Sequence, residues 1–385
     1  MSPSTTRKLL AIHRWCGVIV SLNFLVLALT GLILVFHDEI DDALGVLPPV
    51  DTAGEKVTIT RAVEIARAKD PAAKVTYVFQ RPEESPGIVF VGLAETGKFR
   101  DSRPIAVDLH GDGRVLDQVV LEDTFTSLVL QLHAELFAKL PGRLFLGLVA
   151  IAVVVSLVTG AIVYGPTMRR FAFGLLRRDR SRRTFLADIH KLVGAATFGW
   201  NLVVASTGVL LALSTILFQH WAATEIGAFG ARHAGEPMVT DWSTLDAAIA
   251  AAEKTAPGRH WSLVALPGSD YASPRHYTIS LEGGNGIDAH LPKYVVTDAV
   301  HPDVVEPVQT PWYIEAIALS EPLHFGNYGG LPLKIVWSAF TLVTLGLSIT
   351  GVWIFFSGRR APRRVRNAGN AEHERAESGA TQAAA

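Results

Sequence analysis

The sequence predicts an all-α membrane protein, a four-helix bundle of two pseudo-symmetric halves, with two α+β domains on its outer side. Two observations predict this class: an apolar composition gathered into blocks, and an internal repeat. Hydrophobic residues make up 49% of the 385 positions. Each apolar block holds about 19 to 27 residues without a charge, enough to cross about 30 Å of hydrocarbon. The blocks are residues 18–36, 144–164, 192–218 and 335–356.

The repeat relates the first helix to the third and the second to the fourth. HRWCG begins at His13 and HKLVG at His190, and each histidine is followed by Gly at +4 and by Thr-Gly at +17 and +18. The matched residues are His13, Gly17, Thr30 and Gly31 in one copy and His190, Gly194, Thr207 and Gly208 in the other. His133 precedes Gly160 by 27 positions, and His324 precedes Gly351 by the same number. The chain is therefore a duplicated unit of helix, outer domain and helix.

The first apolar block resembles a signal peptide in one respect, because Arg7 and Lys8 precede it. Its apolar run is longer than a typical signal core, and FHDEIDDAL after it offers no small-residue cleavage site. We therefore expect this helix to be retained. Cys16 is the single cysteine, which excludes an intramolecular disulfide, a thiolate cluster and a c-type haem attachment motif.

Arginine clusters set the expected topology. RRFAFGLLRRDRSRR lies between the second and third helices, and GRRAPRRVR follows the fourth. Short basic loops stay in the cytoplasm, so both termini and the central loop are expected inside. The outer segments 38–132 and 221–323 hold 17 acidic and 10 basic residues, and 13 acidic and 5 basic residues, respectively. This acidic balance disfavours nucleic acid as a partner.

The two outer segments follow one pattern. ITRAVEIARAKDP and TLDAAIAAAEKTAP each read as an amphipathic helix with a threonine placed to cap it. Alternating runs follow, KVTYVFQ and GIVFVGLA in one copy, WSLVALPG and HYTISLEG in the other. Each copy closes with a hairpin whose turn is GDG or HPD. We expect two small α+β domains.

The predicted boundaries follow from these elements. They are the first membrane helix at 1–37, the first outer domain at 38–132, the second helix with its histidine segment at 133–168, the basic loop at 169–187, the third helix at 188–220, the second outer domain at 221–323, the fourth helix with its histidine segment at 324–358, and a disordered tail at 359–385.

A parallel duplication implies a pseudo-twofold axis along the membrane normal. His13 should then face His190 near the inner surface, and His133 should face His324 near the outer surface. Gly31 and Gly208 reach the level of the outer pair, and Gly160 and Gly351 that of the inner pair. Two neutral imidazoles with space between them suit the axial positions of an iron porphyrin, so we expect two haem b sites. Glycines would clear room for the macrocycle or for helix packing.

Other interpretations of the histidines stay open. A histidine at a membrane boundary is often only interfacial, and a non-haem metal would find few carboxylates nearby, namely Asp188 and Glu135. His220 and His37 lie near outer helix ends without a symmetry counterpart and are reserve ligands. The remaining histidines of the outer segments are expected at the surface: His110, His233, His260, His276, His290 and His301.

The motifs HRWCG, LHAELFAKLPGR, VTGAIVYGP, HFGNYGGLPLK and SITGVWIFFSGRR together resemble the PepSY-domain transmembrane proteins, also described as iron-regulated inner-membrane proteins. The resemblance covers nearly the whole chain before the tail. It implies four membrane helices, two periplasmic PepSY domains, location in the bacterial inner membrane, and haem ligation by His13, His133, His190 and His324. Some members of that family are di-haem ferric-siderophore reductases.

The expected function is therefore electron transfer across the membrane to a ferric siderophore, with release of Fe(II). The electron donor would be a cytoplasmic reductant or a membrane quinol, since the chain lacks a dinucleotide-binding glycine fingerprint. Siderophores hold Fe(III) through hard oxygen donors, so one electron suffices for release. Two alternatives remain, a membrane-anchored regulatory protein whose PepSY-like domains bind a peptide or protease, and a transporter. Aromatic candidates for docking are Trp242, Trp261, Trp312 and Tyr313.

Overall fold

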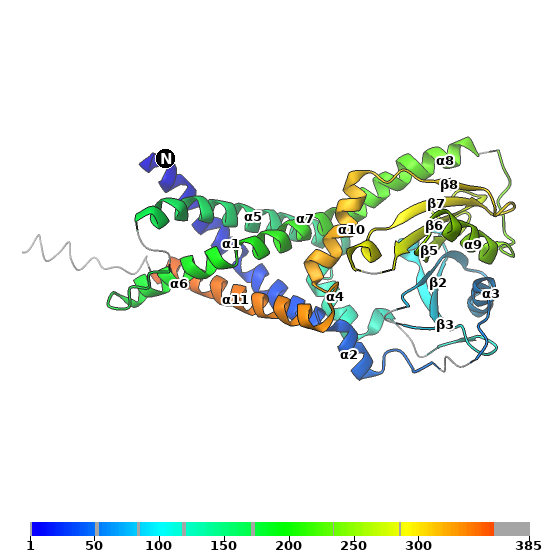
Figure 1. Cartoon of the computed structure of the whole chain (residues 1–385), viewed down its shortest axis with the longest axis horizontal. Coiled ribbons are helices and arrows are strands. Elements are labelled where there is room, and N and C mark those ends of the chain that lie inside the picture. Colours follow the sequence, from blue (N-terminus) through cyan, green and yellow to red (C-terminus); the bar gives the residue numbers. More distant parts are fainter. Residues whose placement is uncertain are drawn as a thin grey trace, which may run out of the picture. The chain divides into compact units, whose positions relative to one another are not determined.

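A computed structural model describes residues 2–50, 54–82, 85–117, 121–170, 174–233, 235–284 and 286–357 (Figure 1). The predicted tail at 359–385 lies outside the described residues. The chain forms two compact units. One contains residues 1–25, 155–199 and 342–385, and the other contains residues 26–154 and 200–341.

Among the residues that the structure describes, four helical segments are long and apolar enough to cross a membrane: Pro3–Leu34, Lys139–Gly165, Phe198–Arg232 and Gly330–Ser357. Large apolar side chains lie exposed along them, including Leu22 at 71% and Leu148 at 66%. A soluble protein seldom exposes so many aliphatic side chains on long helices, whereas lipid tails cover such surfaces. The chain is therefore a multi-pass membrane protein, as the sequence predicts.

The helices and strands have the following bounds. The helices are α1 (Pro3–Leu34), α2 (His37–Leu44), α3 (Ile59–Lys69), α4 (Phe125–Glu135), α5 (Lys139–Arg170), α6 (Arg182–Ala196), α7 (Phe198–Trp221), α8 (Gly227–Arg232), α9 (Leu245–Thr255), α10 (Trp312–Phe325) and α11 (Gly330–Ser357). The strands are β1 (Lys74–Gln80), β2 (Ile88–Ala94), β3 (Arg103–Asp108), β4 (Arg114–Val115), β5 (Arg259–Ala265), β6 (His276–Gly283), β7 (Lys293–Asp298) and β8 (Val305–Pro307).

Within the described ranges, the predicted strands form a single antiparallel sheet of eight strands in the order β4-β3-β2-β1-β5-β6-β7-β8. Each predicted segment supplies four consecutive strands, and both predicted hairpins, β3–β4 and β7–β8, are present. The two halves join through β1 and β5, where Val78 pairs with Val264. The sequence pattern does not predict this junction. Pairing of β1 with β5 makes both of them central strands, so neither is left with an unpaired edge.

The sheet is buried on both faces at its centre. Along β2, Val89 and Val91 belong to a core shared with α3 and α9, whereas Ile88 and Phe90 belong to a second cluster. Successive side chains of a strand point to opposite faces, so α3 and α9 cover one face and other segments cover the other (Figure 1). A strand buried on both faces explains the nearly continuous apolar run IVFVGLA.

The two domain helices begin differently. Thr58 caps α3, because its hydroxyl accepts a hydrogen bond from the Arg61 N–H at 3.1 Å, whereas Thr60, the threonine of the predicted stretch, is the second residue of the helix. The predicted cap at Thr244 is wrong. Its hydroxyl donates to the Ala299 carbonyl at 2.6 Å, away from the first turn of α9. On α9, Asp246 accepts from the first backbone N–H groups of α3, at 2.8 Å from Ile59 and 3.0 Å from Thr60.

We expect Asp246→Ala to lower the stability of the sheet domain by about 1 to 2 kcal/mol, because it leaves two N–H groups of α3 without their acceptor. The effect is measured as a shift in the thermal transition of the purified protein, with unfolding of the sheet domain monitored by limited proteolysis. Asp303→Ala, at an exposed turn between β7 and β8, is the control and should leave the transition in place. An unchanged transition in Asp246→Ala would refute a capping role.

The long helices are interrupted beside the predicted histidines. His133 lies on α4, which ends at Leu136 with φ 50°, and α5 begins after it. His324 lies on α10, which ends at the left-handed Gly326. His190 lies on α6, which ends at Thr197 before α7 begins. The predicted third helix, residues 188–220, is thus two helices, α6 and α7, with Thr197 between them.

Candidate functional site

Four histidines form two pairs, and each pair lies within one unit of the structure. The rings of His13 and His190 have centroids 6.4 Å apart with an angle of 70° between their planes. The rings of His133 and His324 have centroids 6.3 Å apart and an angle of 68°. The structure therefore brings together the histidines that the repeat matches. Both pairs have the same spacing and the same crossing angle.

Each of the four rings is held through its Nδ1 atom. His133 Nδ1 lies 2.8 Å from Thr30 Oγ1, and His324 Nδ1 lies 3.1 Å from Thr207 Oγ1 and 3.0 Å from the Val204 carbonyl. The threonine hydroxyls donate to backbone carbonyls of their own helix, so their oxygens accept the histidine proton. At this pair the threonine of each Thr-Gly dipeptide is thus a hydrogen-bond acceptor for the opposite imidazole.

The other pair is held in the same way, with one substitution. His190 Nδ1 lies 3.2 Å from Thr350 Oγ1, whose hydroxyl donates to the Leu347 carbonyl. His13 Nδ1 lies 2.8 Å from the Ser156 carbonyl. A carbonyl only accepts, so Nδ1 of His13 carries the proton. In all four rings Nδ1 is engaged in a hydrogen bond, so Nε2 is the ring nitrogen available to bind a ligand.

The ring spacing fits a metal atom held between two imidazoles. A transition metal lies about 2 Å from an imidazole nitrogen, so two nitrogens on opposite sides of one metal place their ring centroids about 6 Å apart. Direct packing of two imidazoles would allow a closer approach. The donor set of two neutral imidazoles fits haem iron at both pairs.

Glycine lies against each of the four rings. A Cβ atom at Gly160 would lie 2.9 Å from His13 Cε1, and one at Gly351 would lie 3.1 Å from His190 Cε1. At Gly31 and Gly208 the corresponding distances are 3.2 Å to His133 and 3.3 Å to His324. These glycines make room for the imidazole rings themselves, a more local role than clearing space for a macrocycle.

Gly17 and Gly194 occupy a different environment from the other four glycines. A Cβ at Gly17 would meet Ser156 Oγ at 3.7 Å, and one at Gly194 would meet the Leu347 side chain at 3.8 Å. These are ordinary packing distances. A role for Gly17 and Gly194 in cofactor binding stays a prediction.

The reserve ligands have other contacts. His37 Nε2 lies 2.9 Å from Asp38 Oδ1, and His37 Nδ1 lies 2.9 Å from the Leu34 carbonyl, so both ring nitrogens are engaged. The hydrogen bond from His37, and after it the ammonium of Lys334, hold the pKa of Asp38 down at about 2 against the opposing effect of burial. His220 is exposed beside the ring of Tyr313.

Two of the histidines predicted at the surface are buried. His110 is 7% exposed, with its ring against Gly87 and Asp108, and His276 is 5% exposed, with its ring packed against Phe229 and His233. The surface prediction is therefore wrong for these two. His260, next to Glu253 with 75% of its side chain exposed, lies at the surface as predicted.

Carboxylates near the two histidine pairs are occupied by arginine. Asp188, two residues before His190, accepts from Arg177 Nε at 2.9 Å and Nη2 at 2.8 Å. Glu135, two residues after His133, lies 3.4 Å from Arg143 Nη2. A non-haem metal at either pair would have to compete with these guanidinium groups for its carboxylate ligand. The arrangement favours an imidazole-only donor set.

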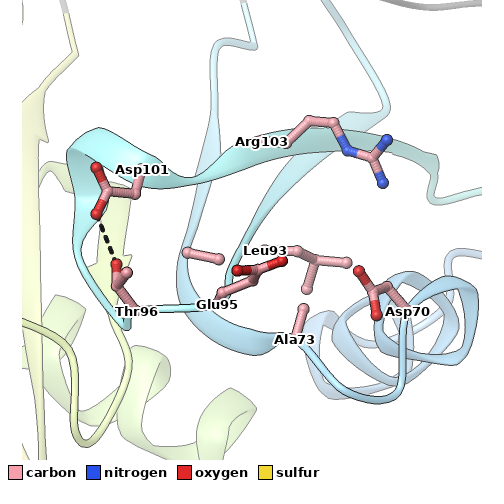
Figure 2. A pocket seen from close by; sticks show the side chains of 8 residues that line it. Asp70, Ala73, Leu93, Glu95, Thr96, Asp101 and Arg103 are labelled. Carbon is pink, nitrogen blue, oxygen red and sulfur yellow. Dashed lines mark hydrogen bonds between the residues drawn. The ribbon is translucent and has the colours of Figure 1, made fainter.

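The sheet domain also contains an open pocket of about 370 Å³ (Figure 2). Carboxylates of Asp70, Glu95 and Asp101 line it together with Arg103, and Asp101 accepts from the Thr96 hydroxyl at 2.7 Å. None of its lining residues is a histidine. The pocket is polar and acidic, and the sequence pattern gives no sign of it because its residues come from separate elements.

Of the four docking aromatics, two lie in the interior. Trp261 is 8% exposed in the shared core, and Trp242 packs against that core with Arg67 over its ring. Trp312, in contrast, is 75% exposed at the start of α10, next to Tyr313. Trp312 is the aromatic residue best placed to meet a partner or a lipid headgroup.

The membrane helices and the sheet domain define a class, that of multi-pass membrane proteins carrying an extramembrane α+β domain of the PepSY kind. The chain belongs to the family described as PepSY-associated TM region, whose match covers residues 10–358. A relative from Pseudomonas aeruginosa, named Uncharacterized protein PA4219, is 32% identical over 89 residues. That stretch spans 23% of this chain and 22% of the relative.

Proposed function

We propose that this protein is a di-haem b electron-transfer protein of the bacterial inner membrane that reduces ferric siderophores in the periplasm and releases Fe(II). The termini would face the cytoplasm, and a cytoplasmic reductant or membrane quinol would donate electrons. The observation that carries the proposal is the ring spacing of 6.3 to 6.4 Å, found independently at two histidine pairs.

The residues of each pair have defined tasks. His13 and His190 would hold one haem, and His133 and His324 the other. Bound there, each haem iron would supply a one-electron carrier. The Thr30, Thr207 and Thr350 hydroxyls and the Ser156 carbonyl orient the rings and keep the ligating nitrogen unprotonated. The apolar helices around them keep water away.

The sheet domain would receive the ferric complex. Its two segments carry seven and eight more acidic than basic residues, and carboxylates line the open pocket of Figure 2. Such a surface attracts cationic complexes and the released Fe(II) and repels polyanions. Reduction at this surface needs no nucleophile or general base from the chain, because electron transfer to Fe(III) breaks no covalent bond.

An absorption spectrum of the purified protein tests the proposal. We expect a Soret band, and sharp α and β bands after dithionite reduction, with about two haems per chain in a pyridine haemochromogen assay. Anaerobic mixing of the reduced protein with a panel of ferric siderophores should then oxidise it. A colourless protein from haem-replete cells would refute the redox function and favour the peptide- or protease-binding alternative.

Thr30→Val should leave haem bound but raise the midpoint potential of the His133/His324 site by about 40 mV, the equivalent of about 1 kcal/mol for one electron. The hydrogen bond accepted by Thr30 makes His133 a more basic ligand, which favours ferric iron. Redox titration of the α band measures the shift. Thr341→Val is the control, since the Thr341 hydroxyl only donates to the Trp337 carbonyl. Equal potentials in both variants would contradict the orienting role.

A further inference from the structure

The sheet domain contains a second group of potential metal ligands. It shares no residue with the two histidine pairs, and it includes a carboxylate. His233, Glu236 and His276 each offer one ligand atom, and these three atoms lie within 4.8 Å of one another. His233 Nδ1 is 3.1 Å from Glu236 Oε1. Unlike the haem-ligand candidates, this group combines two imidazoles with a carboxylate.

Local structure brings the three residues together. α8 ends at His233, and a turn follows in which the Glu236 N–H donates to the His233 carbonyl at 3.1 Å. The Val239 N–H then donates to the Pro274 carbonyl at 2.9 Å, which ties this segment to the start of β6. His276 is the first residue of β6 and pairs across the sheet with Asp298. The ligands therefore come from a turn and from a sheet position that the backbone fixes.

The surrounding groups support each ligand. His276 Nδ1 lies 2.7 Å from Ser273 Oγ, which leaves Nε2 as the nitrogen that can bind a metal. Arg275 Nε lies 3.5 Å from Glu236 Oε2 and 2.9 Å from Asp298 Oδ2. The Arg275 guanidinium therefore faces Oε2 of Glu236, and Oε1 of the same carboxylate faces His233. Outer partners of this kind hold ligating histidines and carboxylates in position.

Charge and access also suit a cation. The carboxylates of Glu236 and Asp298 carry two negative charges and the Arg275 guanidinium carries one positive charge, which leaves one net negative charge beside the imidazoles. Asp298 Oδ2 lies 3.8 Å from His276 Nε2, close enough to supply a further oxygen. His233 and Glu236 keep 26% and 32% of their side chains exposed, which leaves a path from solvent.

We propose that His233, Glu236 and His276 form a binding site for a divalent first-row transition metal ion. Two imidazoles and a carboxylate form a donor set that binds Zn²⁺ and Fe²⁺ in proteins and suits hard alkaline-earth cations poorly. The site is independent of haem. It adds a metal-binding function to the sheet domain whether or not the membrane histidines carry electrons.

Zinc binding by the full-length protein in detergent tests the proposal. The protein is stripped with a chelator and dialysed against Zn²⁺, and bound zinc is counted by mass spectrometry. We expect one zinc per chain. His276→Ala and the isosteric Glu236→Gln should each weaken zinc binding by at least about tenfold. X-ray absorption at the zinc edge should show two imidazole ligands.

His260→Ala provides the matched control, because His260 also lies beside a glutamate, with His260 Nδ1 3.9 Å from Glu253 Oε1, but is exposed. It should retain zinc as the wild type does. Circular dichroism and gel filtration establish that each variant is folded. The proposal is overturned if the wild type retains no zinc, or if Glu236→Gln and His276→Ala retain as much as His260→Ala. Zinc bound at the membrane histidines would give the latter result.

Discussion

Replacing His133 or His324 by alanine is expected to halve the haem content of the purified protein. Under the proposed function, each alanine would remove one of the two imidazoles that would hold that haem, and the remaining ring, whose centroid lies 6.3 Å from that of its lost partner, would not replace it. His13→Ala and His190→Ala should also halve it, by emptying the other site. The two sites differ in their surroundings, so their haems should differ in midpoint potential. His133→Ala and His324→Ala should therefore lose the same redox component, and His13→Ala and His190→Ala should both lose the other.

Pyridine haemochromogen assays give the stoichiometry, and redox titration shows which component is lost. His220→Ala and His37→Ala are the controls. The structure gives these two histidines other contacts, so both variants should keep about two haems per chain. The ligand assignment is wrong if all four paired variants keep full haem, or if either control loses half.

The internal repeat makes the histidine pairing predictable from the sequence. A duplicated chain with parallel halves must place equivalent residues opposite each other, so spacing alone matches His13 with His190 and His133 with His324. The same reasoning places Gly31 and Gly160 at the correct levels. Membrane helices favour this kind of inference, because a rise of about 1.5 Å per residue converts sequence position directly into depth.

Other features depend on contacts between distant segments, which no local pattern encodes. The pairing of β1 with β5 joins strands almost two hundred residues apart, and each strand alone reads as an ordinary edge or central strand. The hydrogen bonds from the histidine rings to Thr30 and Thr207 depend on helix rotation, which the Thr-Gly spacing leaves undetermined. The predicted run HYTISLEG begins at His276, but the burial of His276 depends on its packing against the rings of Phe229 and His233, which lie more than 40 residues away in the sequence.

The cluster of His233, Glu236 and His276 shows a different limit. The segment from His233 to Glu236 has the i, i+3 spacing of a possible ligand pair, a signal that the sequence does contain. Its third member lies 40 residues further along, and tertiary contacts such as the hydrogen bond between Val239 and Pro274 and the ion pair between Arg275 and Glu236 bring the two segments together. A symmetry argument could not find this group, because it belongs to one half of the chain alone.

Gly160→Ala is expected to reduce haem binding at the His13/His190 site by about tenfold or more and leave the other site filled. The added methyl would lie 2.9 Å from His13 Cε1 and 3.0 Å from Nδ1, closer than packed atoms tolerate. The ring must then move or break its hydrogen bond to the Ser156 carbonyl. Overpacking of this kind costs about 1 to 3 kcal/mol, and axial ligation tolerates displacements of only about 0.5 Å.

Gly165→Ala is a closely matched control, because it lies on the same helix five residues further along and a Cβ there meets nothing within 4 Å. Gly351→Ala and Gly346→Ala repeat the comparison on α11, with His190 Cε1 at 3.1 Å from the first and open space at the second. Haem titration of the apoprotein measures each affinity. Equal affinities within both matched pairs would show that the glycines serve helix packing only, and that the imidazoles need no clearance from the neighbouring backbone.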